Sequence, residues 1–231
     1  MNQSLVVITN ILSKLTFTIL IILSVLFNSA AYSDSDIKLE RLVNFTNIDL
    51  KAFEDVSFKD NTNYQVVLLD ARKVLRAESK ASASGLLLKK TIDISKTPYL
   101  NWRWRLEKGL SELPETTKSG DDYAARIYLI YSSGWFFWQT KALNYVWSSR
   151  KAKETTWPNA YAPDNAMMKA IRDRSDETGI WYSEKRNIQD DFKVWLGENI
   201  SEIEGVAIMT DTDDSEGHAI VYYGDIFFSA D

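Results

Sequence analysis

One seven-residue stretch constrains the fold of this chain more than any other. Residues 100–106 read Leu-Asn-Trp-Arg-Trp-Arg-Leu, so apolar and polar side chains alternate strictly. Successive side chains of a β-strand point to opposite faces of its sheet, so this pattern predicts a strand with an apolar face and a polar face. The stretch is therefore a signature of an all-β protein.

Short runs rich in β-branched and aromatic residues recur along the rest of the chain, and turn residues separate them. Segments with helical periodicity are scarce, which disfavours a parallel sheet built from alternating strands and helices. The sequence therefore predicts an all-β, antiparallel β-sandwich of jelly-roll or galactose-binding-like type. The predicted strands are residues 64–70, 73–78, 85–94, 99–106, 124–131, 143–147, 203–210 and 220–228.

One short helix is predicted at residues 190–196, where apolar side chains recur at helical spacing. Asp190 is expected to cap its start and Gly197 to end it. Residues 167–174 fit a helix or a strand, because eight residues are too few for periodicity to decide. The irregular segment 148–165 is long for a loop in a compact domain, and such loops often carry function.

The N-terminal segment differs from the rest of the chain. Residues 15–27 are uncharged and apolar, they follow Lys14, and they lead to the small residues Ser29 and Ala31. This is the pattern of a secretory signal peptide that is cleaved after Ala31.

The sequence therefore predicts a signal peptide over residues 1–31 and a single β-sandwich domain over residues 32–231. The expected location is periplasmic or secreted, with no membrane insertion after signal cleavage. An uncleaved anchor is the alternative. A membrane-spanning helix needs about 20 consecutive apolar residues, and Asn10 and Lys14 interrupt the longer apolar stretch.

Charge and metal-binding residue types exclude several classes of function. The formal net charge is −5, so nucleic acid is not an expected partner. The chain has no cysteine and one histidine, which excludes disulfides, thiolate metal sites and multi-histidine metal centres. That histidine, His218, follows Glu216 and Gly217 and is expected in a turn. No phosphate-binding loop or dinucleotide fingerprint is present.

Two acidic residues and an arginine are closely spaced at the start of a predicted strand. Asp121 and Asp122 precede the strand that carries Arg126. A buried arginine requires a carboxylate partner, so one interpretation is that an acid from another strand end pairs with Arg126 and fixes the sheet. The functional interpretation is that Arg126 lies at the base of a pocket and holds an anionic or hydroxyl-rich ligand through its forked donors.

A second acidic segment ends a later strand. If the backbone stays extended, Asp211 and Asp213 lie on one face with Cα atoms about 6.6 to 7 Å apart. Both could then coordinate one hard cation such as calcium. The segment is not an EF-hand loop, because Glu216 stands where that loop requires glycine. Turn capping by the aspartate side chains is the alternative.

Aromatic residues provide the remaining functional indication. The chain has eight tryptophans, and residues 135–138 are four consecutive aromatics that cannot all face one core. Tryptophan rings suit the apolar faces of sugars, whose rims form hydrogen bonds. Arg103, Arg105 and Trp147 are therefore further candidate ligand-binding residues.

Six ordered sequence blocks together resemble a bacterial family of domains of unknown function, number 3047. The resemblance extends from about Phe45 to Phe228 and implies an exported bacterial domain with no established activity. The last blocks are also similar to carbohydrate-binding jelly rolls, in which an acid-rich turn precedes a strand that ends in Asp-Ile. The blocks are residues 100–105, 120–126, 143–147, 184–188 with Asp191, Phe192 and Gly197, 208–213 and 222–226.

These observations favour a non-catalytic domain that binds a saccharide or a similar polyhydroxylated ligand. A hydrolase acting on envelope glycans through paired aspartates is one alternative, since carboxyl groups about 5.5 or 6.5 to 9.5 Å apart define the two hydrolysis geometries. A structural envelope protein without a ligand is the other. The predicted polar cluster consists of Asp121, Asp122, Arg126, Asp211 and Asp213.

Overall fold

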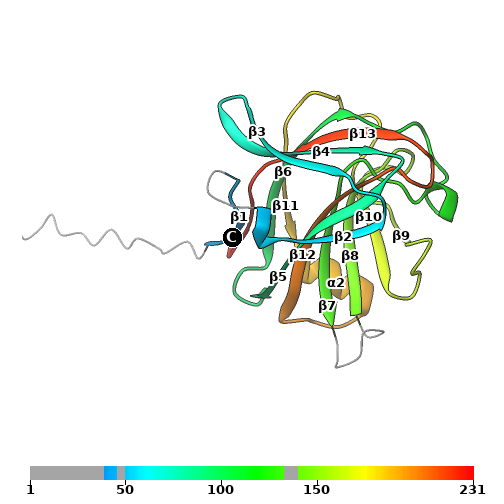
Figure 1. Cartoon of the computed structure of the whole chain (residues 1–231). Helices are drawn as coiled ribbons and strands as arrows, with labels where there is room; N and C mark the ends of the chain where they lie inside the picture. Colours follow the sequence, from blue (N-terminus) through cyan, green and yellow to red (C-terminus); the bar gives the residue numbers. More distant parts are fainter. Residues whose placement is uncertain (1–38, 46–49, 133–139) are drawn as a thin grey trace, which may run out of the picture. The chain divides into compact units, whose positions relative to one another are not determined.

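Two seven-stranded sheets pack against each other in the part of the chain that the computed structural model describes, residues 39–45, 50–132 and 140–231 (Figure 1). The predicted signal peptide and the aromatic run at residues 135–138 lie outside the described residues. Residues 38–231 form one compact unit. Among the described residues, no helix has the length and apolar character needed to cross a membrane.

The first sheet is antiparallel throughout, and strand β6 pairs with three neighbours in it. Its order is β1 (Leu39–Val43), β14 (Ile226–Ser229), β6 (Tyr99–Lys108), β13 (His218–Tyr223), β4 (Arg72–Lys80) and β3 (Asn63–Leu69), with β11 (Tyr182–Asn187) paired to β6.

The second sheet is antiparallel except for the parallel pair β8 and β10. Its order is β2 (Glu54–Lys59), β5 (Ala83–Asp93), β12 (Glu202–Asp211), β7 (Arg126–Ser132), β8 (Thr140–Trp147), β10 (Ala166–Arg172) and β9 (Thr156–Pro158). The described residues also form the 3-10 helices η1 (Leu50–Ala52) and η2 (Lys118–Gly120) and the helix α2 (Ile188–Leu196). The predicted fold class, an antiparallel β-sandwich of jelly-roll type with one short helix, is confirmed.

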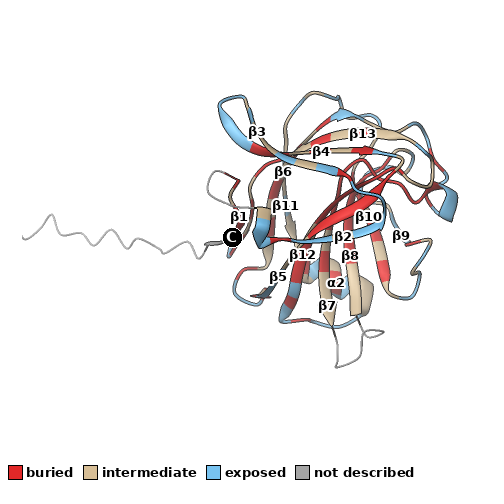
Figure 2. Cartoon of the chain, in the orientation of Figure 1, coloured by how far each residue is buried: buried red, intermediate tan, exposed pale blue. Residues whose placement is uncertain are grey.

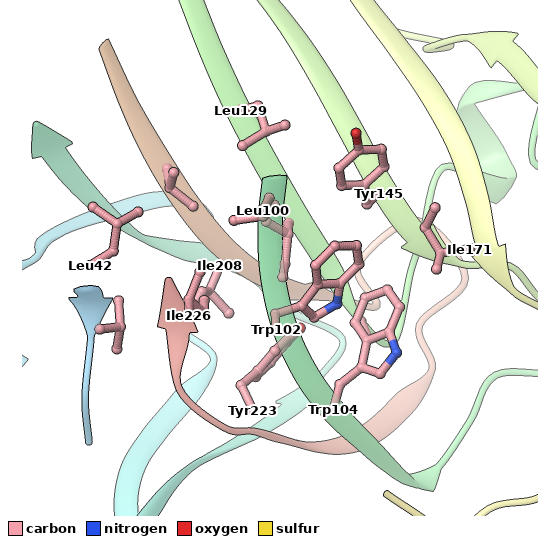
Figure 3. Close-up of a cluster of buried hydrophobic side chains, with 14 of the residues drawn as sticks. Leu42, Leu100, Trp102, Trp104, Leu129, Tyr145, Ile171, Ile208, Tyr223 and Ile226 are labelled. Atoms are coloured by element: carbon pink, nitrogen blue, oxygen red, sulfur yellow. The ribbon is translucent and has the colours of Figure 1, made fainter. Parts of the chain in front are cut away.

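The main core lies between the two sheets and confirms the alternation predicted for β6. Its apolar side chains are buried, whereas Asn101, Arg103 and Arg105 on the opposite face stay partly accessible. Trp102 stacks on Tyr145 of the other sheet, with ring centroids 5.3 Å apart and planes 6° from parallel (Figure 3). Figure 2 shows that buried residues follow the strands, while exposed residues gather on β3 and the loops. Contacts between aromatic rings of the two sheets therefore help to hold the sandwich together.

The helix α2 begins two residues earlier than predicted. Its N-terminal cap is Asn187, whose side chain accepts a hydrogen bond from the backbone N–H of Asp190, so the predicted capping role of Asp190 is wrong. Gly197 ends the helix in the left-handed conformation, with φ of 77°, as predicted. Ile188 and Phe192 are buried in the main core.

Three further predictions are refined by the structure. The predicted strand at residues 220–228 is two strands, β13 and β14, separated at Gly224 and Asp225. In the ambiguous segment 167–174, residues 167–172 belong to the strand β10. His218 is the first residue of β13 rather than a turn residue, and its ring contacts Glu78 and Lys108.

Candidate functional site

The candidate site lies on the face of the second sheet that points away from the main core. Ile127 and Ile208 are buried in the main core, and neighbouring residues along each strand point to the opposite face. Arg126 of β7 therefore lies on this outer face and is paired in register with Met209 of β12.

A small apolar cluster lies against Arg126, whose side chain is 4% exposed. The cluster packs on β8 and β10 and keeps water from most of the guanidinium group. Its members are Tyr123, Val146, Trp157, Met168 and Ala170.

The guanidinium of Arg126 uses only part of its hydrogen-bonding capacity. Its Nη1 donates to Oδ2 of Asp211 at 3.0 Å, and its Nε donates to Oδ1 of Asn144 at 3.4 Å. Its Nη2 has one acceptor among the described residues, the sulfur of Met168 at 3.8 Å. A guanidinium carries five N–H donors and a thioether sulfur is a weak acceptor, so donors remain for a ligand.

Two tyrosine rings lie beside the Arg126 guanidinium. Its Cζ atom is 4.5 Å from the ring centroid of Tyr128 and 5.0 Å from that of Tyr123. Burial raises the pKa of both tyrosine hydroxyls, so both rings are neutral at physiological pH. The rings hold the guanidinium plane in place through cation–π contacts.

Two buried carboxyl groups face the same nitrogen of Arg126. Oδ2 of Asp121 lies 3.9 Å from Nη1, farther than the Asp211 contact, and Asn159 donates its Nδ2 to both oxygens of Asp121 at 2.8 Å. Burial raises the pKa of Asp121, and it raises that of Asp211 well above its usual value, although Arg126 opposes the shift in each case. Burial thus disfavours the charged form of both carboxyl groups, while the guanidinium favours it.

Asp213 lies in the turn after β12, and Asp122, which precedes β7, contacts that turn; among the described residues neither pairs with Arg126. The carboxylate of Asp122 accepts backbone N–H groups of Asp214 at 3.1 Å and Ser215 at 2.6 Å. Ligand atoms of Asp122, Asp213 and Asp214 all lie within 4.8 Å of one another. Of the predicted calcium pair, Asp211 contacts Arg126 and Asp213 belongs to this acidic group. Through these two N–H contacts the side chain of Asp122 caps the turn that follows β12.

Asp121, Arg126, Tyr128, Asp211 and Asp213 line a cavity of about 420 Å³ on the outer sheet face. Phe58 and Tyr161 belong to its lining and are 69% and 54% exposed, so they form its rim. The Tyr161 hydroxyl donates to Asp214 at 2.6 Å, which ties the rim to the acidic turn. The lining comprises Phe58, Ala83, Asp121, Arg126, Tyr128, Asn159, Tyr161, Ala162, Ala166, Met209, Asp211, Asp213 and Asp214.

Four predicted ligand-binding residues, Asp122 among them, lie outside this cavity. Arg103 stacks over the ring of Trp181 at 4.5 Å, and Arg105 pairs with Glu107 at 3.0 Å. Trp147 is buried in the main core and also lines a separate cavity of about 260 Å³, which Asp122 shares. Of the predicted residues, the structure brings Asp121, Arg126, Asp211 and Asp213 into one cavity.

Tyr128, Asn159 and Tyr161 are among the cavity-lining residues that the sequence did not identify as site residues. Tyr128 lies two positions after Arg126 in the same strand, so strand alternation places both on one face and could have identified it. Asn159 and Tyr161 belong to the long irregular segment 148–165. No local pattern in that segment indicates which of its side chains line the cavity.

Comparisons with known proteins identify a family but no activity. The model of a family described as "Protein of unknown function (DUF3047)" matches residues 51–227. None of the curated proteins matches this chain.

The solved structures with a similar chain trace include three enzymes that act on polysaccharides. One is a thermostable cellulase derived from Cel12A of Rhodothermus marinus, with 8% identity, a TM-score of 0.43, and coverage of 76% of this chain and 100% of that chain. The second is the family 11 xylanase from Neocallimastix patriciarum, with 12% identity, a TM-score of 0.33, and coverage of 77% and 96%. The third is the xyloglucanase domain of NopAA from Sinorhizobium fredii in complex with cellobiose, with 10% identity, a TM-score of 0.36, and coverage of 79% and 100%. At these identities and TM-scores, the similarity assigns no activity to this chain.

Proposed function

We propose, for a chain that belongs to the DUF3047 family of proteins of unknown function, that the cavity around Arg126 binds a saccharide or similar polyhydroxylated ligand without transforming it. The observation that carries this proposal is the spare donor capacity at Nη2 of Arg126, whose neighbouring Nη1 lies 3.9 Å from the carboxyl group of Asp121. Each sugar hydroxyl both donates and accepts hydrogen bonds, so a site that offers donors beside acceptors matches its chemistry.

The charge of the cavity supports a neutral ligand over an anionic one. Four carboxyl groups line the cavity with one guanidinium: Asp121, Asp211, Asp213 and Asp214 outnumber Arg126. An added anion would be repelled by this excess of acidic groups, whereas a neutral polyol would not. The rings of Tyr128 and Tyr161 offer flat apolar surfaces for the C–H face of a sugar.

The test is a glycan array followed by titration calorimetry, on protein produced from the full chain. The substitution Asp121→Asn removes an acceptor charge from the cavity and should weaken binding at least tenfold. Tyr161→Ala removes an exposed rim ring and should also weaken binding, with little effect on folding. Glu177→Gln, at an exposed residue outside the cavity lining, is the matched control and should bind as the unmodified protein does. Absence of binding to every glycan, or binding that neither cavity variant weakens, would refute the proposal.

Hydrolysis of envelope glycans is a second candidate, favoured by one specific observation. Asp121 and Asp211 both line the cavity, and burial raises the pKa of each carboxyl group, as a glycosidase acid requires. A reducing-end assay over a glycan panel tests this candidate. Turnover that Asp211→Asn abolishes and Glu177→Gln preserves would support it, and no turnover on any glycan would eliminate it.

The proposal includes export of the domain at residues 32–231 to the periplasm or the medium. It is supported by the apolar segment at residues 15–27 and by the small residues before position 32. N-terminal sequencing of the protein from a bacterial host should begin at Tyr32. A protein that keeps Met1 would support the alternative of an uncleaved anchor.

A further inference from the structure

An apolar groove continues from the cavity across the same sheet face. A hollow of about 150 Å³ lies over strands β2, β5, β12 and β7. It shares Phe58, Tyr128 and Met209 with the cavity around Arg126. One ligand can therefore extend from the polar cavity into the groove.

The register of the strands explains why the sheet is hollowed here. Gly85 is paired with Met209, and Ala207 is paired with both Leu87 and Tyr128. Gly85 and Ala207 are the smallest residues on this part of the face, and larger side chains surround them. A Cβ atom on Gly85 would lie 3.1 Å from the carbonyl oxygen of Ile208, so the backbones of β5 and β12 approach closely at this point.

The groove offers a ligand almost no hydrogen-bonding groups. Among the side chains that line it, only that of Tyr128 carries a polar atom, and its hydroxyl already lies 3.3 Å from the sulfur of Met209. A second sugar ring placed here would leave its hydroxyls without partners, and desolvating unpaired hydroxyls is costly. An aliphatic chain loses no hydrogen bonds and gains from burial.

We infer that the ligand is a saccharide that carries an aliphatic chain, with the sugar beside Arg126 and the chain in the groove that continues from its cavity. This inference rests on the proposed function and adds the chemical class of the ligand. The 69% exposed side chain of Phe58 stands where the two hollows meet, and it contacts the ligand at the junction between sugar and chain.

The test compares methyl and octyl glycosides of glucose, galactose and maltose by titration calorimetry, below the concentrations at which the octyl compounds form micelles. The octyl compound of at least one sugar should bind at least tenfold more tightly than its methyl counterpart, because only the octyl chain reaches the groove. Equal affinities within every pair would overturn the inference, while binding of both members would leave the proposed function standing.

Two variants locate the chain in the groove. Ala207→Ile fills the hollow with a residue that suits a strand and should reduce the affinity for the octyl compound to that for the methyl compound. Phe58→Ser removes an exposed apolar wall and should weaken octyl binding even if Ala207→Ile folds poorly. Gln65→Ile, at an exposed position on β3 of the other sheet, is the matched control and should leave both affinities unchanged. Octyl binding that neither groove variant weakens would overturn the inference.

Two further measurements exclude other occupants of the groove. If octyl phosphocholine binds as tightly as the octyl glycosides, the cavity does not select a sugar, and both the inference and the proposed function fail. If the protein is a dimer in solution and Ala207→Ile dissociates it, a second copy of the chain occupies the groove and the inference fails. A monomer that prefers octyl glycosides supports it.

Discussion

Replacing Arg126 with methionine tests the buried pair on which the cavity is built. The side chains of Arg126 and Asp211 are each 4% exposed and lie 3.0 Å apart. Arg126→Met keeps much of the side-chain volume but leaves the Asp211 carboxyl group with one remaining hydrogen bond, from the N–H of Tyr123 at 3.2 Å. Removing one partner of a buried ion pair costs about 3 to 5 kcal/mol, so we expect the free energy of unfolding at pH 7 to fall by that amount.

The assay is urea denaturation with linear extrapolation to water. The double variant Arg126→Met/Asp211→Asn removes both charges and should be more stable than Arg126→Met alone, because no unpaired carboxylate remains buried. A loss below about 1 kcal/mol for Arg126→Met, or no recovery in the double variant, would refute the reasoning.

The same variant predicts a pH dependence with a definite sign. Burial raises the pKa of Asp211, and loss of the cationic partner raises it further above the unfolded value of about 3.9. A carboxyl whose folded pKa exceeds its unfolded pKa contributes stability that is present below the unfolded pKa and is lost as pH rises through the folded pKa. The stability difference between Arg126→Met and the unmodified protein should therefore be smaller at pH 4 than at pH 7. A difference of the same size at both values would contradict this reasoning.

Two further predictions concern other polar contacts. The buried hydroxyl of Tyr223 accepts the Arg126 backbone N–H at 3.1 Å and donates to the Met209 carbonyl at 2.8 Å, so Tyr223→Phe should cost about 1 to 3 kcal/mol of unfolding free energy in urea. Unchanged stability in that variant would show that these backbone groups find other partners. Side-chain hydrogen bonds to Glu78, the most effective from Lys80 and the next from His218 and Arg76, lower its pKa from 4.5 to about 2. The stability that Glu78 contributes is therefore present above pH 4.5 and is lost as pH falls toward 2. In Glu78→Gln the melting temperature should therefore change less with pH between pH 4.5 and pH 2 than in the unmodified protein. Identical plots of melting temperature against pH for the two proteins would exclude this contribution.

The fold could be predicted from the sequence where the spacing of apolar residues matches the burial of a single strand face. In residues 100–106 a period of two matches one buried face, and β6 forms there. The interpretation that an acid from another strand end pairs with Arg126 is confirmed by Asp211. It could be made from the sequence because a buried guanidinium requires a carboxylate partner. The first inference follows from a pattern within one strand, and the second follows from the need of a buried charge for an opposite charge.

The features that were missed depend on contacts between distant residues. Asn159 lies 38 residues from Asp121 along the chain, and its two hydrogen bonds depend on the path of an irregular segment. The parallel pairing of β8 with β10 likewise depends on tertiary packing, which no local pattern encodes. Asn187 and Asp190 are both good capping residues, so tertiary contacts selected the earlier start of α2.

A crystal structure of the protein soaked with its best-binding saccharide tests the central claim most directly. The account predicts a sugar in the cavity, with a hydroxyl that accepts a hydrogen bond from Nη2 of Arg126 and another that donates to the carboxyl group of Asp121. A sugar bound instead beside Arg103 and Trp181 on the first sheet, with none in the cavity, would contradict it.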